Sequence, residues 1–330
     1  MAEPSSAQQR GHHMNQLLRA MVSAACVWAS LAQAQTGSDS IRIIVPFAAG
    51  GPADQIARTI AQPLAAQMGK TVVIDNRGGA GGVIGVSAVT KAPADGNTLL
   101  LTTSSLVITS GITPNLPYNP RKDVEPLYLL GEVQTMLVVR PGLGVSTLSE
   151  LVAKAKGPNK LNYGSTGVGG TMHIGAELFA KAANVSMVHI PYRGAAPALV
   201  DLMGGTVDLV NADVPVLRPY IRDGRIKGVV VFDTKRSPQL PDIPTAAEAG
   251  MPALQMTNWY GVLVPAGTPP EMKKKLEAAL HHVVHQADVA AKLADAGFSN
   301  PKDSAGFGAR LQADFERWLP WLKEAQIRAD

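Results

Sequence analysis

The chain has 330 residues, of which 46% are hydrophobic and only 5% aromatic, and its formal net charge is +4. This length and composition indicate a globular protein with one large core or two medium ones, and typical domain sizes favour two. Lysine and arginine are scattered with no run of five or more like charges, so we expect no nucleic-acid partner.

The first 34 residues are predicted to form a secretory signal peptide. Arg10 and Arg19 precede a short apolar stretch that ends in the small-residue motif AQA, which is typical of a cleavage site after Ala34. Met14 is an alternative start, because a more ordinary signal peptide begins there. Cleavage would give an exported, periplasmic protein. It would also remove Cys26, the only cysteine, which excludes disulfides and a thiol nucleophile from the mature chain.

Short β-branched runs alternate with helical patterns along the mature chain, which indicates βα units around parallel sheets. Ten strands are too many for one small sheet. The predicted strands are 41–47, 71–76, 98–104, 127–133, 135–140, 160–165, 185–191, 206–212, 226–232 and 259–265.

Two glycine- and proline-containing crossovers, near 131–135 and 250–258, divide the predicted strands into two groups. This division predicts a first lobe made of 35–134 and 258–330, with a second lobe, 135–257, inserted into it. A cleft would then lie between the two α/β lobes.

Two helices are predicted with specific ends. Apolar residues at every fourth position predict a helix that begins at Pro52 and is closed by Gly69. Thr268 and Glu271 form a capping-box pattern that predicts one long helix reaching about Ala296. The same pattern recurs at Thr147 with Glu150 and at Thr245 with Glu248.

Four glycine-rich turns follow predicted strands and open helices. We name them the first turn (48–52), the second turn (76–82), the third turn (163–173) and the fourth turn (191–198). In such turns, unpaired backbone amides and the positive end of a helix dipole meet, which suits an anion. All four lie where ligands bind in open α/β sheets. For the first turn, an ordinary connection that needs glycine for its geometry is an equally good interpretation.

Nucleotide phosphate fits the glycine patterns poorly. The stretch GKT at 69–71 would need a glycine at position 64 to form a P-loop, and Leu64 stands there. The stretch GGAGGVIG at 78–85 has Ile84 at the third glycine position of a dinucleotide fingerprint. His281 and His285 have the spacing of a metal pair without the glutamate of H-E-x-x-H. We therefore expect neither a cofactor nor a metal ion.

A serine hydrolase is an alternative interpretation of the third turn. Ser165 precedes His173 by eight residues, and the two side chains could approach each other. The serine lacks the G-x-S-x-G motif, however, because no glycine lies two residues before it.

Seven segments occur in order from Ile41 almost to the end of the chain: IRIIVPFAAGGPADQIAR, VVIDNRGGAGGVIG, ADGNTLLL, NYGSTGVGGTMH, IPYRGAAPALVDLMGGTVDL, LPDIPTAAEAG and WYGVLVPAGTP. Together they closely resemble the Bug family, the extracytoplasmic solute-binding proteins of tripartite tricarboxylate transporters. The resemblance implies an α/β, two-lobed type II periplasmic-binding-protein fold with a ligand cleft between the lobes. It also implies a monomeric receptor without enzyme activity that closes on a small organic carboxylate and delivers it to membrane permease subunits.

The resemblance further implies that main-chain amides and bridging water hold one carboxylate. These amides would come from 47–51 and 165–171, while the second and fourth turns add to the cleft wall and Asp213 faces the ligand. Gly170 departs from the family pattern, which commonly has serine or threonine there, so one hydroxyl contact is in doubt. The complete set of predicted ligand-binding residues is Phe47, Ala48, Ala49, Gly50, Gly51, Asp54, Gly79, Ala80, Gly81, Ser104, Ser105, Ser165, Thr166, Gly169, Gly170, Thr171, His173, Arg193, Ala195, Ala196 and Asp213.

Specificity is expected from the side chains of Ser104, Ser105, Arg193 and Asp213, because backbone amides recognise only the carboxylate group. A small aliphatic di- or tricarboxylate is favoured over an aromatic acid. Two alternatives stay open: an exported hydrolase that uses Ser165 and His173, and a binding module that presents its closed form to a receptor for sensing.

Overall fold

The computed structural model describes residues 40–329. The predicted signal peptide, the alternative start at Met14 and Cys26 lie outside these residues. Contacts group Ile41–Asp330 into one compact unit. Within the described part of the chain, no helix is both long enough and apolar enough to cross a membrane.

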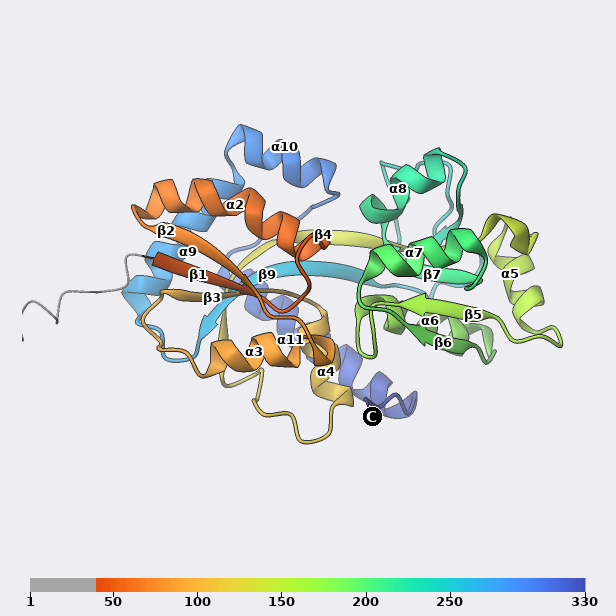
Figure 1. Cartoon of the computed structure of the whole chain (residues 1–330), viewed down its shortest axis with the longest axis horizontal. Helices are drawn as coiled ribbons and strands as arrows, with labels where there is room; N and C mark the ends of the chain where they lie inside the picture. The colour runs from red at the N-terminus through yellow and green to blue at the C-terminus, as the bar shows by residue number, and fades with distance from the viewer. Residues whose placement is uncertain (1–39, 330) are drawn as a thin grey trace, which may run out of the picture. The chain divides into compact units, whose positions relative to one another are not determined.

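In the described part of the chain, nine strands form two groups that share one strand, β4 (Figure 1). The first group has the order β2-β1-β3-β9-β4, and in the second β4 lies between β8 and β7, followed by β5 and β6. The strands are β1 (Ser40–Val45), β2 (Thr71–Asn76), β3 (Thr98–Thr103), β4 (Val124–Val139), β5 (Asn162–Ser165), β6 (Val188–Pro191), β7 (Leu209–Asp213), β8 (Lys227–Val231) and β9 (Thr257–Pro265).

The strand β4 runs through both groups. Its first part pairs antiparallel with β9 as far as Gln134, and from Thr135 onward it pairs with β7 and β8. The prediction of two separate strands, 127–133 and 135–140, is therefore wrong. Irregular register near Gly131 accommodates the change of direction without ending the strand, because the missing side chain leaves room for Phe298.

Helices cover the faces of these strands (Figure 1). The α-helices are α2 (Pro52–Met68), α3 (Val83–Thr90), α4 (Ser105–Ile112), α5 (Leu148–Ala155), α6 (Thr171–Ala183), α7 (Ala195–Gly204), α8 (Val214–Arg222), α9 (Pro270–Val284), α10 (Ala287–Asp295) and α11 (Ser304–Glu324). Two short 3₁₀ helices are η1 (Ala80–Gly82) and η2 (Pro141–Leu143).

The predicted helix ends are confirmed in part. Helix α2 begins at Pro52 and is closed by Gly69 in the left-handed conformation, as its pattern predicts. The capping box of Thr147 with Glu150 is present, and Thr245 and Glu248 exchange the same pair of hydrogen bonds at a turn.

The prediction of one long helix reaching about Ala296 is wrong, because α9 and α10 are separate helices. Thr268 does not cap α9, since its hydroxyl donates to the carbonyl of Pro265. The chain is extended at Gln286. This break lets Val289 and Leu293 join the same buried cluster as the apolar face of α2.

Alternating side chains bury both faces of the strands. In β1, Ile43 belongs to the cluster under α2 and α9, whereas Ile44 belongs to the cluster that includes α4 and α11. In β7, Leu209 packs toward α6 and Val210 toward α7 and α8. Since helices cover both faces, the carboxyl ends of the parallel strands are left for the four turns.

Candidate functional site

The first and second turns lie side by side at the ends of β1 and β2. The amide of Arg77 donates to the carbonyl of Val45 over 2.8 Å, and the side-chain amide of Asn76 donates to the carbonyl of Phe47 over 3.3 Å. These bonds tie the start of the second turn to the start of the first.

The third and fourth turns are joined in the same way at the ends of β5 and β6. Ser165 pairs with Pro191 in the parallel register, and the amide of Tyr192 donates to the carbonyl of Ser165 over 2.9 Å. The predicted neighbours at the carboxyl ends of these strands therefore do meet.

Glycines bring the second and third turns together against α4. A β-carbon at Gly81 would lie 2.9 Å from Cγ2 of Thr109 and 3.1 Å from the carbonyl oxygen of Val168. A β-carbon at Gly169 would lie 2.6 Å from Cδ1 of Ile112. Since real β-carbons do not approach so closely, only glycine allows these contacts, and all four turns form one connected set.

The first turn is held by the buried carboxylate of Asp54. Its Oδ2 accepts hydrogen bonds from the Gly50 amide at 2.8 Å and from Nε of Arg58 at 2.9 Å, and the residue is 2% exposed. Burial raises the pKa of Asp54, but the bonds from Arg58 and Gly50 outweigh it and hold the pKa below its ordinary value. Within residues 40–329, the amides of Ala48 and Ala49 have no acceptor.

The second turn places four consecutive residues, 79–82, in the left-handed region, with φ between 48° and 127°. Three of them are glycines and the fourth is Ala80, so the backbone there is specialised. Arg77 beside this turn forms an ion pair with Asp75 at 2.8 Å. Its charge is therefore already paired.

The third turn has two amides that bond inward. The amide of Gly167 donates to Oγ of Ser165 over 3.1 Å, and the amide of Gly169 donates to Nδ1 of His173 over 3.3 Å. Oγ of Ser165 also lies 2.6 Å from Nε2 of His189. The alternative of a Ser165 nucleophile activated by His173 is wrong, because the ring that contacts the Ser165 hydroxyl is His189 and Ser165 is fully buried.

Burial favours the neutral form of both histidines behind the third turn. Burial lowers the pKa of His173 to about 3, with the nearby His189 adding to the effect. Burial also lowers the pKa of His189. Their rings stack with centroids 4.3 Å apart.

Helix α6 begins at the third turn and presents its first amides there. Thr171, Met172 and His173 are its first three residues, so their amides have no acceptor within the helix. Gly170 is the N-cap and supplies no side-chain cap. Oγ1 of Thr166 lies 2.5 Å from where a β-carbon at Gly170 would stand, so the Thr166 hydroxyl occupies the space that a serine or threonine would fill.

The fourth turn carries an exposed cation, Arg193. Within the described residues 40–329, Arg193 has no ion pair and no hydrogen bond. Gly194 follows in the left-handed region with φ 125°, and α7 begins at Ala195 without a side-chain cap. Ala196 is exposed beside it. A guanidinium and a helix N-terminus therefore lie together and suit an anion.

The predicted specificity residues Ser104 and Asp213 are joined by a buried chain of hydrogen bonds. Oγ of Ser104 donates to Oδ1 of Asn258 over 2.8 Å, and Nδ2 of Asn258 donates to Oδ2 of Asp213 over 3.1 Å. The hydroxyl of Tyr260 donates to the same Oδ2 over 2.6 Å. Burial raises the pKa of Asp213 to about 6, although the Tyr260 and Asn258 bonds lower it.

The neighbouring Ser105 is likewise engaged, because its Oγ accepts from the hydroxyl of Thr103 over 3.0 Å. Sequence reasoning missed three polar residues at this site, His189, Asn258 and Tyr260. Each lies on a strand whose register decides its neighbours, and none stands in a glycine-rich turn.

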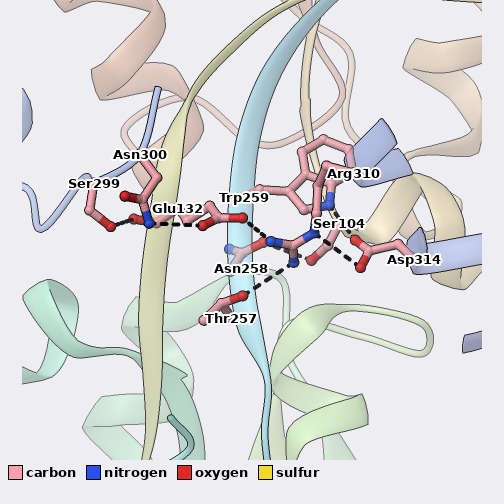
Figure 2. Close-up of polar contacts among 9 residues, drawn as sticks. All are labelled: Ser104, Glu132, Thr257, Asn258, Trp259, Ser299, Asn300, Arg310 and Asp314. Carbon is pink, nitrogen blue, oxygen red and sulfur yellow. Dashed lines mark hydrogen bonds and ion pairs between the residues drawn. The ribbon is translucent and has the colours of Figure 1, made fainter. Parts of the chain in front are cut away.

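A pocket of about 640 Å³ lies elsewhere, around the middle of β4 and the start of β9. None of the predicted ligand-binding residues lines it. In Figure 2, Arg310 points toward Glu132, Thr257 and Asp314 around these strands. The carboxylate of Glu132, which lines the pocket, therefore already has Arg310 and Asn300 as partners.

A network of polar groups that runs from buried to exposed positions lies around these two strands (Figure 2). Nε1 of Trp259 donates to Oδ2 of Asp314 over 2.6 Å, and Nε of Arg310 lies 3.1 Å from its Oδ1. Burial raises the pKa of Asp314, while Arg310 and Trp259 lower it. Asn300 and Ser299 hydrogen-bond the other side of the network at Glu132.

Solved structures similar to the chain include the following three. The periplasmic binding protein BugD has a TM-score of 0.81 and 29% identity, covering 88% of this chain and 99% of BugD. Rpa4515 of Rhodopseudomonas palustris, solved with adipate, has a TM-score of 0.82 and 32% identity, covering 89% and 99%. MatC from the same organism, with bound malate, has a TM-score of 0.78 and 31% identity, covering 85% and 98%.

These likenesses confirm the α/β periplasmic-binding-protein fold. The family called TctC, described as the tripartite tricarboxylate transporter family receptor, matches residues 56–326. This match spans most of the chain and includes the third and fourth turns completely. The chain therefore belongs to the tripartite tricarboxylate transporter receptor family, whose members are solute-binding receptors and not enzymes.

Proposed function

We propose that this receptor captures a small aliphatic dicarboxylate and delivers it to the membrane permease subunits of a tripartite tricarboxylate transporter. The observation that carries the proposal is that the connected set of four turns holds both amides without acceptors and the guanidinium of Arg193, which has no partner within residues 40–329. The similar proteins solved with malate and adipate support this ligand class, because both ligands are aliphatic dicarboxylates.

One carboxylate of the ligand would bind the first and third turns. The amides of Ala48 and Ala49 and the first amides of α6 are the donors that this group requires. Oriented backbone dipoles can hold a carboxylate without a buried arginine, because they are fixed before the ligand arrives. The hydroxyl of Thr166 is a further donor beside Gly170.

The second carboxylate would bind Arg193 and the N-terminus of α7. Of the charged side chains beside the four turns, Arg58 and Arg77 are paired with aspartates, whereas Arg193 has no partner within residues 40–329. An arginine can form two parallel hydrogen bonds to a carboxylate. This residue would therefore favour dicarboxylates over monocarboxylates.

Capture would proceed by closure of two lobes. We assign 35–134 with 258–330 to one lobe and 135–257 to the other, with β4 and β9 as connections. Closure would bring Gly169 and Val168 against α4 and the second turn, the contacts described above. Bound ligand would then be removed from water, whereas the open form would let it exchange. The receptor would act as a periplasmic monomer after removal of residues 1–34.

The test is a binding screen of the mature chain, residues 35–330. Adipate, malate, citrate, benzoate and hexanoate are titrated by calorimetry and by thermal unfolding, with a sugar and an uncharged amide as controls. A ligand at about 100 times its Kd adds about 2.7 kcal/mol to the free energy of unfolding. The proposal expects saturable binding of dicarboxylates without product formation. Binding of only the sugar or the amide would overturn it.

A further inference from the structure

A cluster of buried and half-buried polar side chains lies behind the third turn, and the proposed binding contacts do not use these side chains. We call Tyr163, Ser165, His173, Glu177 and His189 the histidine cluster. The ring of His189 stacks between Tyr163 and His173, with centroid distances of 4.8 Å and 4.3 Å. The hydroxyl of Tyr163 donates to the Glu177 carboxylate.

Two members of the cluster accept the inward amides of the third turn. Ser165 takes the amide of Gly167, and His173 takes the amide of Gly169. Both glycines are left-handed, with φ of 107° and 80°, a conformation that an L-residue adopts only at a cost. Two fixed amides on either side of Val168 therefore determine the path of the backbone into α6.

The hydrogen bonds also determine the chemical form of each group. A ring nitrogen that accepts an amide proton carries no proton itself, so His173 must be neutral with its hydrogen on Nε2. Ser165 can accept from Gly167 and donate to Nε2 of His189 at 2.6 Å. The hydroxyl of Ser165 also lies 3.2 Å from the carbonyl oxygen of Gly167.

If these side chains served packing alone, apolar residues would fill the same space with a smaller free-energy cost of folding. Burying polar side chains disfavours folding unless each one is hydrogen-bonded. Here the bonds lead to the turn that opens α6, where Ser165 and His173 are buried and Thr166 is exposed. The arrangement favours a role in fixing the turn.

We propose that His173, and His189 acting through Ser165, are positioning residues that hold the third turn so that the first amides of α6 stay directed at the ligand. The inference rests on the proposed function, since it assigns a role within the same carboxylate site. Neither imidazole touches the ligand.

The experiment compares matched substitutions in the mature chain. His173→Asn keeps an acceptor near the place of Nδ1, whereas His173→Phe keeps a ring without it. His189→Gln and His189→Phe form the corresponding pair for Nε2. Calorimetry with adipate and malate measures affinity, and NMR of ¹⁵N-labelled protein measures hydrogen exchange at Gly167 and Gly169.

Both phenylalanine variants should raise the Kd about tenfold. Hydrogen exchange should accelerate about tenfold or more at Gly169 in His173→Phe, because that amide loses its acceptor, and at Gly167 in His189→Phe, because Ser165 loses the ring that orients its hydroxyl. The asparagine and glutamine variants should retain most of both properties. If the phenylalanine variants bind adipate and malate as tightly as the parent does, this inference is overturned but the proposed function is not. A parent that binds none of the carboxylates would overturn the proposed function as well.

The imidazole ¹⁵N shifts of the parent protein provide a test that needs no variant. At pH 7 they should show His173 neutral, with its hydrogen on Nε2. A hydrogen on Nδ1 would overturn the inference even if the phenylalanine variants fail to fold.

Discussion

Oδ2 of Asp54 accepts a hydrogen bond of 2.8 Å from the backbone amide of Gly50. One of the backbone amides that the sequence predicts to bind an anionic ligand is therefore already bonded to a carboxylate of the protein itself. Its second bond, to Arg58, offsets the negative charge. Asp54 holds the left-handed Gly50 in place, and the amides of Ala48 and Ala49 remain for a ligand.

Asp54→Ala should lower the free energy of unfolding by about 1–3 kcal/mol, because the Gly50 amide and Arg58 lose a charged acceptor. Carboxylate affinity should fall with it, since the first turn loses its anchor. Asp54→Asn should cost less, because its amide oxygen can still accept from Gly50. Urea unfolding and calorimetry with adipate measure the two effects.

The pH dependence of this effect follows from the lowered pKa of Asp54. Its stabilising contribution is complete above the unfolded pKa of about 4 and is lost as pH falls through the lower folded value. Arg58→Gln is the control, since it removes only an exposed partner and should destabilise the protein less than Asp54→Ala does. An Asp54→Ala protein as stable as the parent at pH 7 would contradict the anchoring role.

Asp213 should make the protein more stable at mildly acidic pH. Its folded pKa of about 6 lies above the ordinary value of 3.8, so the folded state binds a proton more tightly than the unfolded state. Stability from this group rises as pH falls from about 6 to about 4. The change in pKa corresponds to about 3 kcal/mol at most. Urea unfolding at pH 4.5 and pH 7 measures it.

Asp213→Asn is the variant that isolates this contribution, because it cannot titrate. The difference in stability between parent and variant should change by about 1–3 kcal/mol between the two pH values. Tyr260→Phe should raise the folded pKa of Asp213 further, because the charged carboxylate would lose a hydrogen-bond donor. The gain in stability on acidification should then begin at a higher pH. If the parent and Asp213→Asn shift equally with pH, the carboxyl group titrates normally.

Local features of the fold were predictable because their causes are local. Gly69 closes α2 since left-handed backbone favours glycine, and Thr147 caps α5 through a partner three residues away. The continuity of β4 was not predictable in this way. Whether a strand continues past Gly131 depends on β9 and Phe298, which are distant in sequence.

The candidate site shows the same division. The four turns were predicted from glycine patterns and from the family resemblance, and the structure brings them together. The partners of their side chains were not predicted. Ser165 meets His189 because β5 and β6 pair in a particular register, and Asp213 meets Asn258 because β9 runs beside β4. No short motif encodes such registers.

Gly169→Ala should impair ligand capture beyond its effect on the backbone. The added β-carbon would lie 2.6 Å from Cδ1 of Ile112 and 3.2 Å from Cγ2 of Thr109, so the third turn would move away from α4. We expect affinity for adipate to fall about tenfold, and stability by about 1–2 kcal/mol. Calorimetry and urea unfolding separate these effects.

Gly167→Ala is the matched control for this variant. Gly167 is also left-handed, with φ 107°, but a β-carbon there would meet nothing within 4 Å. Gly167→Ala should therefore show the cost of placing alanine in left-handed backbone without moving the third turn away from α4. The double variant Gly169→Ala with Ile112→Ala should regain affinity, because the clash is removed. Equal affinity losses in both single alanine variants would show that backbone strain alone is responsible.

Arg193→Gln should convert a dicarboxylate receptor into one that no longer distinguishes adipate from hexanoate. The two ligands have the same number of carbons, and only adipate has a second carboxylate for the guanidinium. Loss of a charge-assisted pair should lower the affinity for adipate about 10- to 100-fold, whereas the affinity for hexanoate should change by less than about threefold. Arg193→Lys should recover part of the preference, since it keeps the charge but not the paired geometry.

Arg77→Gln is the control, because that guanidinium is paired with Asp75 and its loss should affect both ligands alike. Calorimetry at two salt concentrations measures all four proteins. If Arg193→Gln weakens adipate and hexanoate equally, the second carboxylate binds elsewhere, because an interaction specific to that group cannot alter a ligand that lacks it.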